Sequence, residues 1–163
     1  MNNQTVDDLF QECLNEFERI DRLIDVLTST NPAVPFLTKY AIIKACGTIE
    51  QSFKTIIYDY ACKDQSLHVR NFINNSFKES SLNPSLNNIH SSLTKFNEEW
   101  NVKFKQNLKT EPNIERIRTS LQSLNNARNQ FAHGVNLSMT FNDIKLYFED
   151  SMKVIEYLEQ SIH

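Results

Sequence analysis

Residues 36–62 read FLTKYAIIKACGTIEQSFKTIIYDYAC. Hydrophobic residues recur at helical spacing over a wide arc of this stretch, which is typical of a helix surrounded by other helices. Glu50 interrupts the pattern between Cys46 and Phe53. Two interpretations of Glu50 are open: an edge residue whose carboxylate reaches water, and a buried carboxylate that needs a cation.

The flanking segments also repeat hydrophobic residues every three or four positions, which predicts amphipathic helices. These helices are expected at about 5–29, 67–77, 84–104, 112–134 and 140–162. Caps are predicted at Thr5, at Asn83 before Pro84, and at Thr140 with Asp143. The chain has only two glycines and four prolines, and the prolines fall between these segments or at their first residue. The sequence therefore predicts an all-α fold, an antiparallel bundle of four to five main helices forming a single domain over residues 1–163.

The charge balance argues against a protein that coats nucleic acid, because the net charge is −3. Residues 95–128 nevertheless hold seven Lys and Arg against four Glu. Such a segment is usually a solvated face, and a role in contacting phosphates is the alternative.

Gly134 is expected to end the helix over 112–134 in a left-handed cap.

Cysteine usage and the chain ends indicate a cytoplasmic protein. Cys13, Cys46 and Cys62 are odd in number and lie among apolar residues, so buried free thiols are expected. The N-terminus lacks the features of a signal peptide, and no apolar run approaches membrane-spanning length. The four histidines show no ligand spacing, and we expect neither a metal nor a cofactor.

Arg128 stands where the helical pattern calls for a hydrophobic residue. Four hydrophobic residues fall within roughly 80° of one another on a helical wheel, and Arg128 lies in the middle of them. They are Ile117, Leu121, Leu124 and Phe131. A guanidinium in a core-facing position is unfavourable unless it is paired or faces a cavity or a partner.

His133 follows Arg128 by five residues, in the last turn of the same predicted helix. The negative end of the helix dipole favours a protonated histidine there, and a histidine that titrates near neutrality can act as general acid or base. Asn129 lies four residues before His133 and could orient its ring. Arg128 and His133 are about 140° apart on a straight helix. They therefore converge only if the helix end distorts, if the arginine bends round, or if two chains share the site.

Residues 128–133 read RNQFAH. They resemble the Arg-(four to six residues)-His motif of the HEPN superfamily, in which a polar residue commonly follows the arginine. The helical reading of the chain agrees with that resemblance, and Glu50 resembles an acidic position in several branches. The resemblance implies a metal-independent endoribonuclease that acts as a homodimer with a composite active site. His133 would be the acid and base, Arg128 would hold the phosphate, Asn129 would position the histidine or the RNA, and Glu50 would anchor Arg128.

The resemblance also implies roles as a toxin or an anti-phage defence effector, with a cognate inhibitor protein as partner. In the branch paired with small nucleotidyltransferases, a tyrosine stands two residues after the histidine, where this chain has Val135. Two alternatives stay open. One is a non-catalytic HEPN-like module that binds a protein partner or a nucleotide, and the other is a structural bundle in which Arg128 merely pairs with Glu50.

Overall fold

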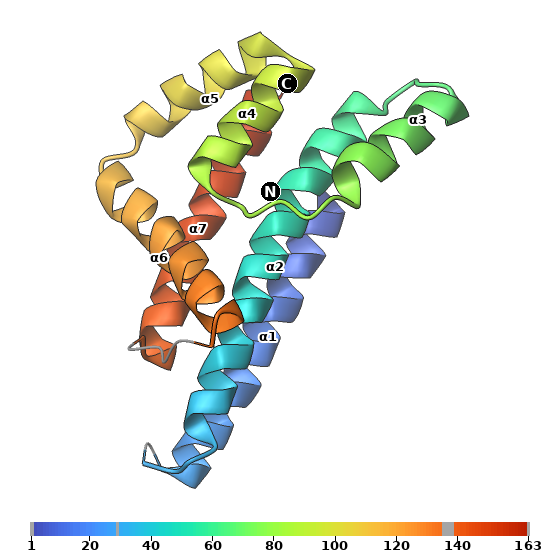
Figure 1. Ribbon diagram of the computed structural model, residues 1–163. Helices are drawn as coiled ribbons and strands as arrows, with labels where there is room; N and C mark the ends of the chain where they lie inside the picture. Colours follow the sequence, from blue (N-terminus) through green and yellow to red (C-terminus); the bar gives the residue numbers. More distant parts are fainter. Residues whose placement is uncertain (1, 29, 135–138, 163) are drawn as a thin grey trace.

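The computed structural model describes residues 2–28, 30–134 and 139–162. Its helices are α1 (Gln4–Leu27), α2 (Val34–Ala61), α3 (Leu67–Ile73), α4 (Leu86–Phe96), α5 (Glu98–Thr110), α6 (Ile114–Ala132) and α7 (Phe141–Ser161), and a π-helical turn, η1 (Asn74–Lys78), follows α3. No strand occurs among these residues. The predicted all-α helical bundle is confirmed (Figure 1).

Helix α2 is the centre of the bundle, as its apolar pattern predicts. It packs against α1, α6 and α7 and also contacts α4 and η1. Its core side chains Ile42, Ile49 and Phe53 are fully buried. The rings of Phe10 in α1 and Phe148 in α7 meet edge to face beside it, with centroids 5.9 Å apart. Helix α3 projects away from the bundle (Figure 1), and the apolar residue Phe72 on it is 72% exposed.

The helix expected over 84–104 is wrong as a single element, because it is broken at Asn97 into α4 and α5. Asn97 has an extended backbone, and its side chain accepts a hydrogen bond from the Glu99 amide at 2.8 Å. Asparagine competes for backbone hydrogen bonds in this way and is favoured at helix starts. Hydrophobic spacing continues across the break, so periodicity alone did not reveal it.

Two of the predicted caps are also wrong. Helix α1 is capped by Asn3, whose side chain accepts from the Val6 amide at 3.1 Å, and Thr5 lies inside the helix. Helix α4 is capped by Ser85 through the Asn88 amide, so Asn83 lies two residues before the cap. In both cases a competing side chain stands within two residues of the predicted one, and only the backbone geometry selects between them.

The other local predictions are confirmed. Thr140 and Asp143 form a reciprocal capping box at the start of α7. Gly134 has φ +73°, a left-handed conformation that ends α6 just after His133. The three cysteines are free and buried, and burial raises the pKa of Cys13 to about 12. Val135 lies outside the described residues, and among those described no helix combines the length and apolar character needed to cross a membrane.

Candidate functional site

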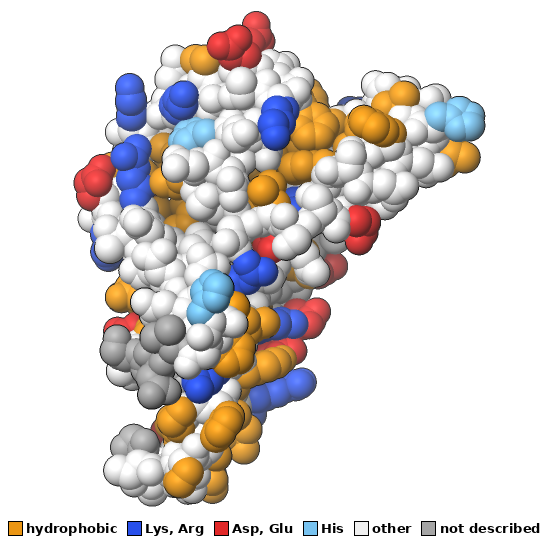
Figure 2. Space-filling view, in the orientation of Figure 1, with side chains coloured by type: hydrophobic (Ala, Val, Ile, Leu, Met, Phe, Trp, Pro, Cys, Tyr) orange, Lys and Arg blue, Asp and Glu red, His pale blue; other side chains and the backbone are white. Residues whose placement is uncertain are grey.

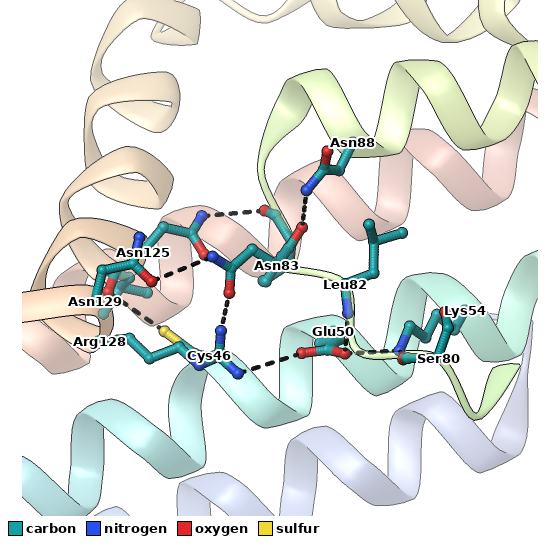
Figure 3. A network of polar contacts seen from close by, with 12 residues as sticks. Cys46, Glu50, Lys54, Ser80, Leu82, Asn83, Asn88, Asn125, Arg128 and Asn129 are labelled. Carbon is teal, nitrogen blue, oxygen red and sulfur yellow. Dashed lines mark hydrogen bonds and ion pairs between the residues drawn. The ribbon is translucent and has the colours of Figure 1, made fainter. Parts of the chain in front are cut away.

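Arg128 lies near the end of α6 and reaches toward α2 and the segment that precedes α4. Its Nη1 donates a hydrogen bond to Oδ1 of Asn83, and its Nη2 lies 3.9 Å from Oε2 of Glu50 (Figure 3). The side chain is 31% exposed. The guanidinium is therefore held in place from two sides and is still accessible from solvent.

Glu50 is a largely buried carboxylate paired with a cation, which favours the second interpretation of its position. Its side chain is 14% exposed. Oε1 accepts from Nζ of Lys54 at 2.6 Å and from the Leu82 amide at 2.9 Å. Lys54 is itself buried and also donates to the Ser80 carbonyl. The closest cation to Glu50 is thus Lys54, one turn along the same helix, and Arg128 is the more distant one.

This arrangement leaves the charge of Arg128 largely uncompensated. Lys54 already balances the negative charge of Glu50, and the hydrogen-bond partner nearest to Arg128 is the neutral amide of Asn83. An arginine held by a neutral acceptor keeps donors and positive charge for an anion. The site can therefore bind a phosphate or stabilise a developing negative charge.

Asn83 joins Arg128 to the next residue of α6. Its Nδ2 donates to Oδ1 of Asn129 at 3.2 Å, and its own carbonyl accepts from Nδ2 of Asn88 at 2.9 Å. Sequence reasoning missed Asn83 and Lys54 as members of the site. The spacing of Lys54, four residues after Glu50, was a usable signal. For Asn83 the sequence offered no signal of a role in the site, because its place before Pro84 indicated only a helix cap.

His133 is the C-cap residue of α6 and is exposed. Its backbone amide donates to the Asn129 carbonyl at 3.1 Å. Within the described part of the chain, its ring forms no hydrogen bond with Asn129 or Arg128. Within the described residues of one protomer, contacts through Asn83 and Glu50 link Arg128 and Asn129, whereas His133 at the end of the helix is joined to this group only through its backbone amide.

The hydrophobic stripe of α6 is buried only in part. Ile117, Leu121 and Leu124 are in the core, whereas Phe131 is 36% exposed, with Nζ of Lys39 5.8 Å from its ring. Phe131, near the end of α6, therefore lies on the surface of the protomer, and the prediction that places it with the core-facing residues of the stripe is wrong.

The cysteine next to the site is not suited to act as a nucleophile. Burial raises the pKa of the Cys46 thiol to about 12, although nearby Arg128 acts in the opposite direction. The thiol donates to the Leu124 carbonyl at 3.4 Å. A reactive cysteine requires a lowered pKa and access to solvent. In the described residues, no cluster of three or more His, Cys, Asp or Glu side chains could hold a metal ion.

Comparison with known families gives a match over most of the chain. The family model described as RiboL-PSP-HEPN matches residues 8–163, which covers nearly the whole chain and all of the site residues. No curated protein and no solved structure gives a significant match.

Proposed function

The chain belongs to the RiboL-PSP-HEPN family, and on that premise we propose that it is a metal-independent endoribonuclease with Arg128, Asn129 and His133 in its active centre. The observation that carries the proposal is the guanidinium of Arg128, which is partly exposed and held by a neutral amide. Its remaining N–H groups can bind a phosphate of RNA.

The proposed reaction is a transesterification followed by release of two RNA ends. The ribose 2′-oxygen forms a bond to the adjacent phosphorus and gives up its proton to a neutral imidazole of His133. The bond from phosphorus to the 5′-oxygen breaks, and that oxygen takes a proton from the imidazolium form of a His133 side chain. The products are a 2′,3′-cyclic phosphate and a 5′-hydroxyl. Arg128 binds the phosphate oxygens, whose negative charge grows in the transition state.

A homodimer would complete the site, since no hydrogen bond joins His133 to Arg128 among the described residues of one protomer. Exposed hydrophobic side chains lie on the first half of α2 and at the end of α6: Phe36, Tyr40, Ile43 and Phe131. Lys39 lies within 6 Å of the rings of both Phe36 and Phe131, so these two belong to one surface. A second copy on this surface would bring its own His133 to a shared cleft and bury apolar area that is otherwise exposed.

In the cell, a cytoplasmic nuclease of this kind would act as a toxin or an anti-phage effector, restrained by a cognate inhibitor protein. The RNA substrate would be unpaired, because the 2′-hydroxyl must rotate into line with the leaving oxygen.

Cleavage of a mixed RNA pool in excess EDTA by the wild type and by His133→Ala tests the proposal. The wild type should cut and leave cyclic-phosphate ends, and the variant should lose at least about 10²-fold in rate, as expected for loss of a general acid–base group. His133 is exposed, so circular dichroism and the thermal midpoint should be unchanged. Equal cleavage by the two proteins would refute the assignment of His133.

A non-catalytic module that binds a protein or a nucleotide is the second candidate. The observation in its favour is that no hydrogen bond joins His133 to Arg128 among the described residues of one protomer. It predicts a folded wild type that cuts no RNA at any concentration, with or without EDTA.

A further inference from the structure

A polar cavity lies between the segment that begins α4 and the outer face of α6, and its lining includes Asn83, the hydrogen-bond partner of Arg128. Its volume is about 470 Å³, within the range of small-ligand sites. Seven of its eleven lining residues carry side-chain amides, and among these eleven there is no carboxylate. We call it the amide pocket. Figure 2 shows this face of the molecule, with few charged side chains in its centre and several Lys and Arg side chains above.

Asn125 forms the inner wall of the amide pocket and is 6% exposed. Its Nδ2 is engaged twice, donating to the carbonyls of Pro84 at 3.2 Å and Leu121 at 3.0 Å. Its Oδ1 is buried, and no hydrogen-bond donor within the described chain reaches it. A buried acceptor without a donor is unfavourable by about 1–3 kcal/mol. This oxygen is therefore a place where a ligand can add the missing donor.

The pocket is continuous with the proposed active site through Asn83 and Asn129. Both residues line it, and both belong to the hydrogen-bonded chain that holds Arg128 (Figure 3). A nucleotide whose phosphate is bound by Arg128 would thus have its base beside the pocket.

The exposed rim of the pocket offers further groups for a ligand. Gln122 and Asn126 are exposed on α6, and their side chains form no hydrogen bond with any described residue. Arg118 is the one charged lining residue, with its Nη1 3.6 Å from Glu115. Amide groups that present a donor beside an acceptor match the edges of nucleobases, and side-chain amides pair with adenine through its amino group and a ring nitrogen.

We propose that the amide pocket binds one unpaired base of the RNA next to the cleaved phosphate and prefers adenine to uracil. This inference rests on the proposed function, because the RNA strand is placed by Arg128. The adenine amino group donates to Oδ1 of Asn125, and a ring nitrogen accepts from the amide of Gln122 or Asn126. Uracil has no amino group and presents a carbonyl oxygen at the same edge. Since Oδ1 of Asn125 is closed off from solvent in the free protein, a neighbouring side chain rotates as the base enters.

The test is binding of two 2′-O-methyl hexanucleotides by fluorescence anisotropy, one all-uridine and one with a single central adenine. These strands cannot be cut, so binding is measured apart from cleavage. The wild type should bind the adenine strand about tenfold more tightly, the discrimination expected of one well-formed amide–base pair. The double variant Gln122→Ala/Asn126→Ala should reduce this preference to less than about twofold. Both positions are exposed, so the fold should be retained.

Gln160→Ala is the matched control, since it removes an exposed amide at the far end of α7, and it should keep the full preference. Equal binding of both strands by the wild type, no binding of either, or an undiminished preference in the double variant would each overturn the subsite. The outcome is separable from that of the nuclease proposal. Adenine-selective binding by a protein that cuts nothing supports the subsite alone, and cleavage without base selectivity supports the nuclease alone.

Discussion

Two of the three arginines of α6, Arg116 and Arg128, stand beside largely buried carboxylates but differ in how their charge is compensated. Near the start of the helix, Nη2 of Arg116 lies 2.7 Å from Oδ1 of Asp150, whose other oxygen accepts from the Ser120 hydroxyl. Near its end, Arg128 lies 3.9 Å from Glu50, and Lys54 takes the closer place. The positive charge of Arg116 is therefore compensated by its carboxylate, whereas that of Arg128 is available to a ligand.

This comparison separates a structural arginine from one available to a ligand. Sequence position does not separate them, since both lie on one helix. What differs is whether a second cation reaches the carboxylate. Lys54 pairs with Glu50, whereas Arg116 is the cation paired with Asp150.

The largest expected effect is on stability, at Glu50. Glu50→Ala should lower the free energy of unfolding by about 3–5 kcal/mol, because it leaves Lys54 buried without a counter-charge. Urea denaturation measures the change. The double variant Glu50→Leu/Lys54→Met should recover most of the loss, since it removes both charges and fills the space. A loss of less than about 1 kcal/mol in Glu50→Ala would show that water compensates Lys54.

The next effect is on cleavage. Arg128→Ala should lower the rate of RNA cleavage by about 10²–10³-fold, the usual loss when one donor to a transition-state charge is removed. Arg116→Ala is the matched control and should stay within about twofold of the wild type. Single-turnover cleavage assays on both variants make the comparison. Similar losses in the two would mean that the arginines do not differ in function.

Asp150→Asn should affect stability without affecting cleavage. The change removes the charge that pairs with Arg116 and supports Ser120, and hydrogen bonds to charged groups are worth about 1.5–3 kcal/mol. Thermal or urea unfolding measures the loss. Arg116→Ala should cost about 1 kcal/mol at most, because that side chain is 53% exposed. A drop in cleavage in Asp150→Asn that matches Arg128→Ala would contradict the division of roles.

The smallest effect concerns pH and His90 in α4, whose ring contacts Asn101 and Phe104 of α5. Burial lowers the pKa of His90, and the neighbouring cations Lys105 and Arg118 lower it further, against a hydrogen bond with Asn101. The unfolded chain therefore binds the proton more tightly. Stability is fully present above the ordinary histidine pKa of about 6.5 and declines as pH falls toward the lower folded value.

Replacing His90 should therefore flatten the pH dependence of unfolding. His90→Gln is expected to lose less stability between pH 7.5 and pH 5 than the wild type does, measured by urea midpoints at each pH. The two proteins are compared as changes from their own values at pH 7.5, so that lost packing does not enter. A steeper decline in the variant would mean that the protonated ring is stabilised in the fold.

Much of the helical architecture could be predicted from local pattern. The central place of residues 36–62, the capping box at Thr140 and the left-handed Gly134 depend on groups a few residues apart, and these are visible in the sequence. The break at Asn97 could not be predicted, because the hydrophobic spacing of α4 continues into α5. Phe131 was misplaced for a related reason, since periodicity gives a direction on the helix but not how closely other helices pack against each turn of it.

For the site, the sequence by itself determined which side chain is out of place, because a guanidinium among hydrophobic positions of α6 is recognisable from helical periodicity. Only the tertiary structure decided how its charge is balanced. A hydrogen bond requires two atoms within about 3 Å, and that condition depends on how α2, α6 and the segment before α4 pack. It brings Asn83 to Arg128 from 45 residues away and lets Lys54 take the closer place at Glu50. Those contacts leave Arg128 charged, accessible and next to the amide pocket.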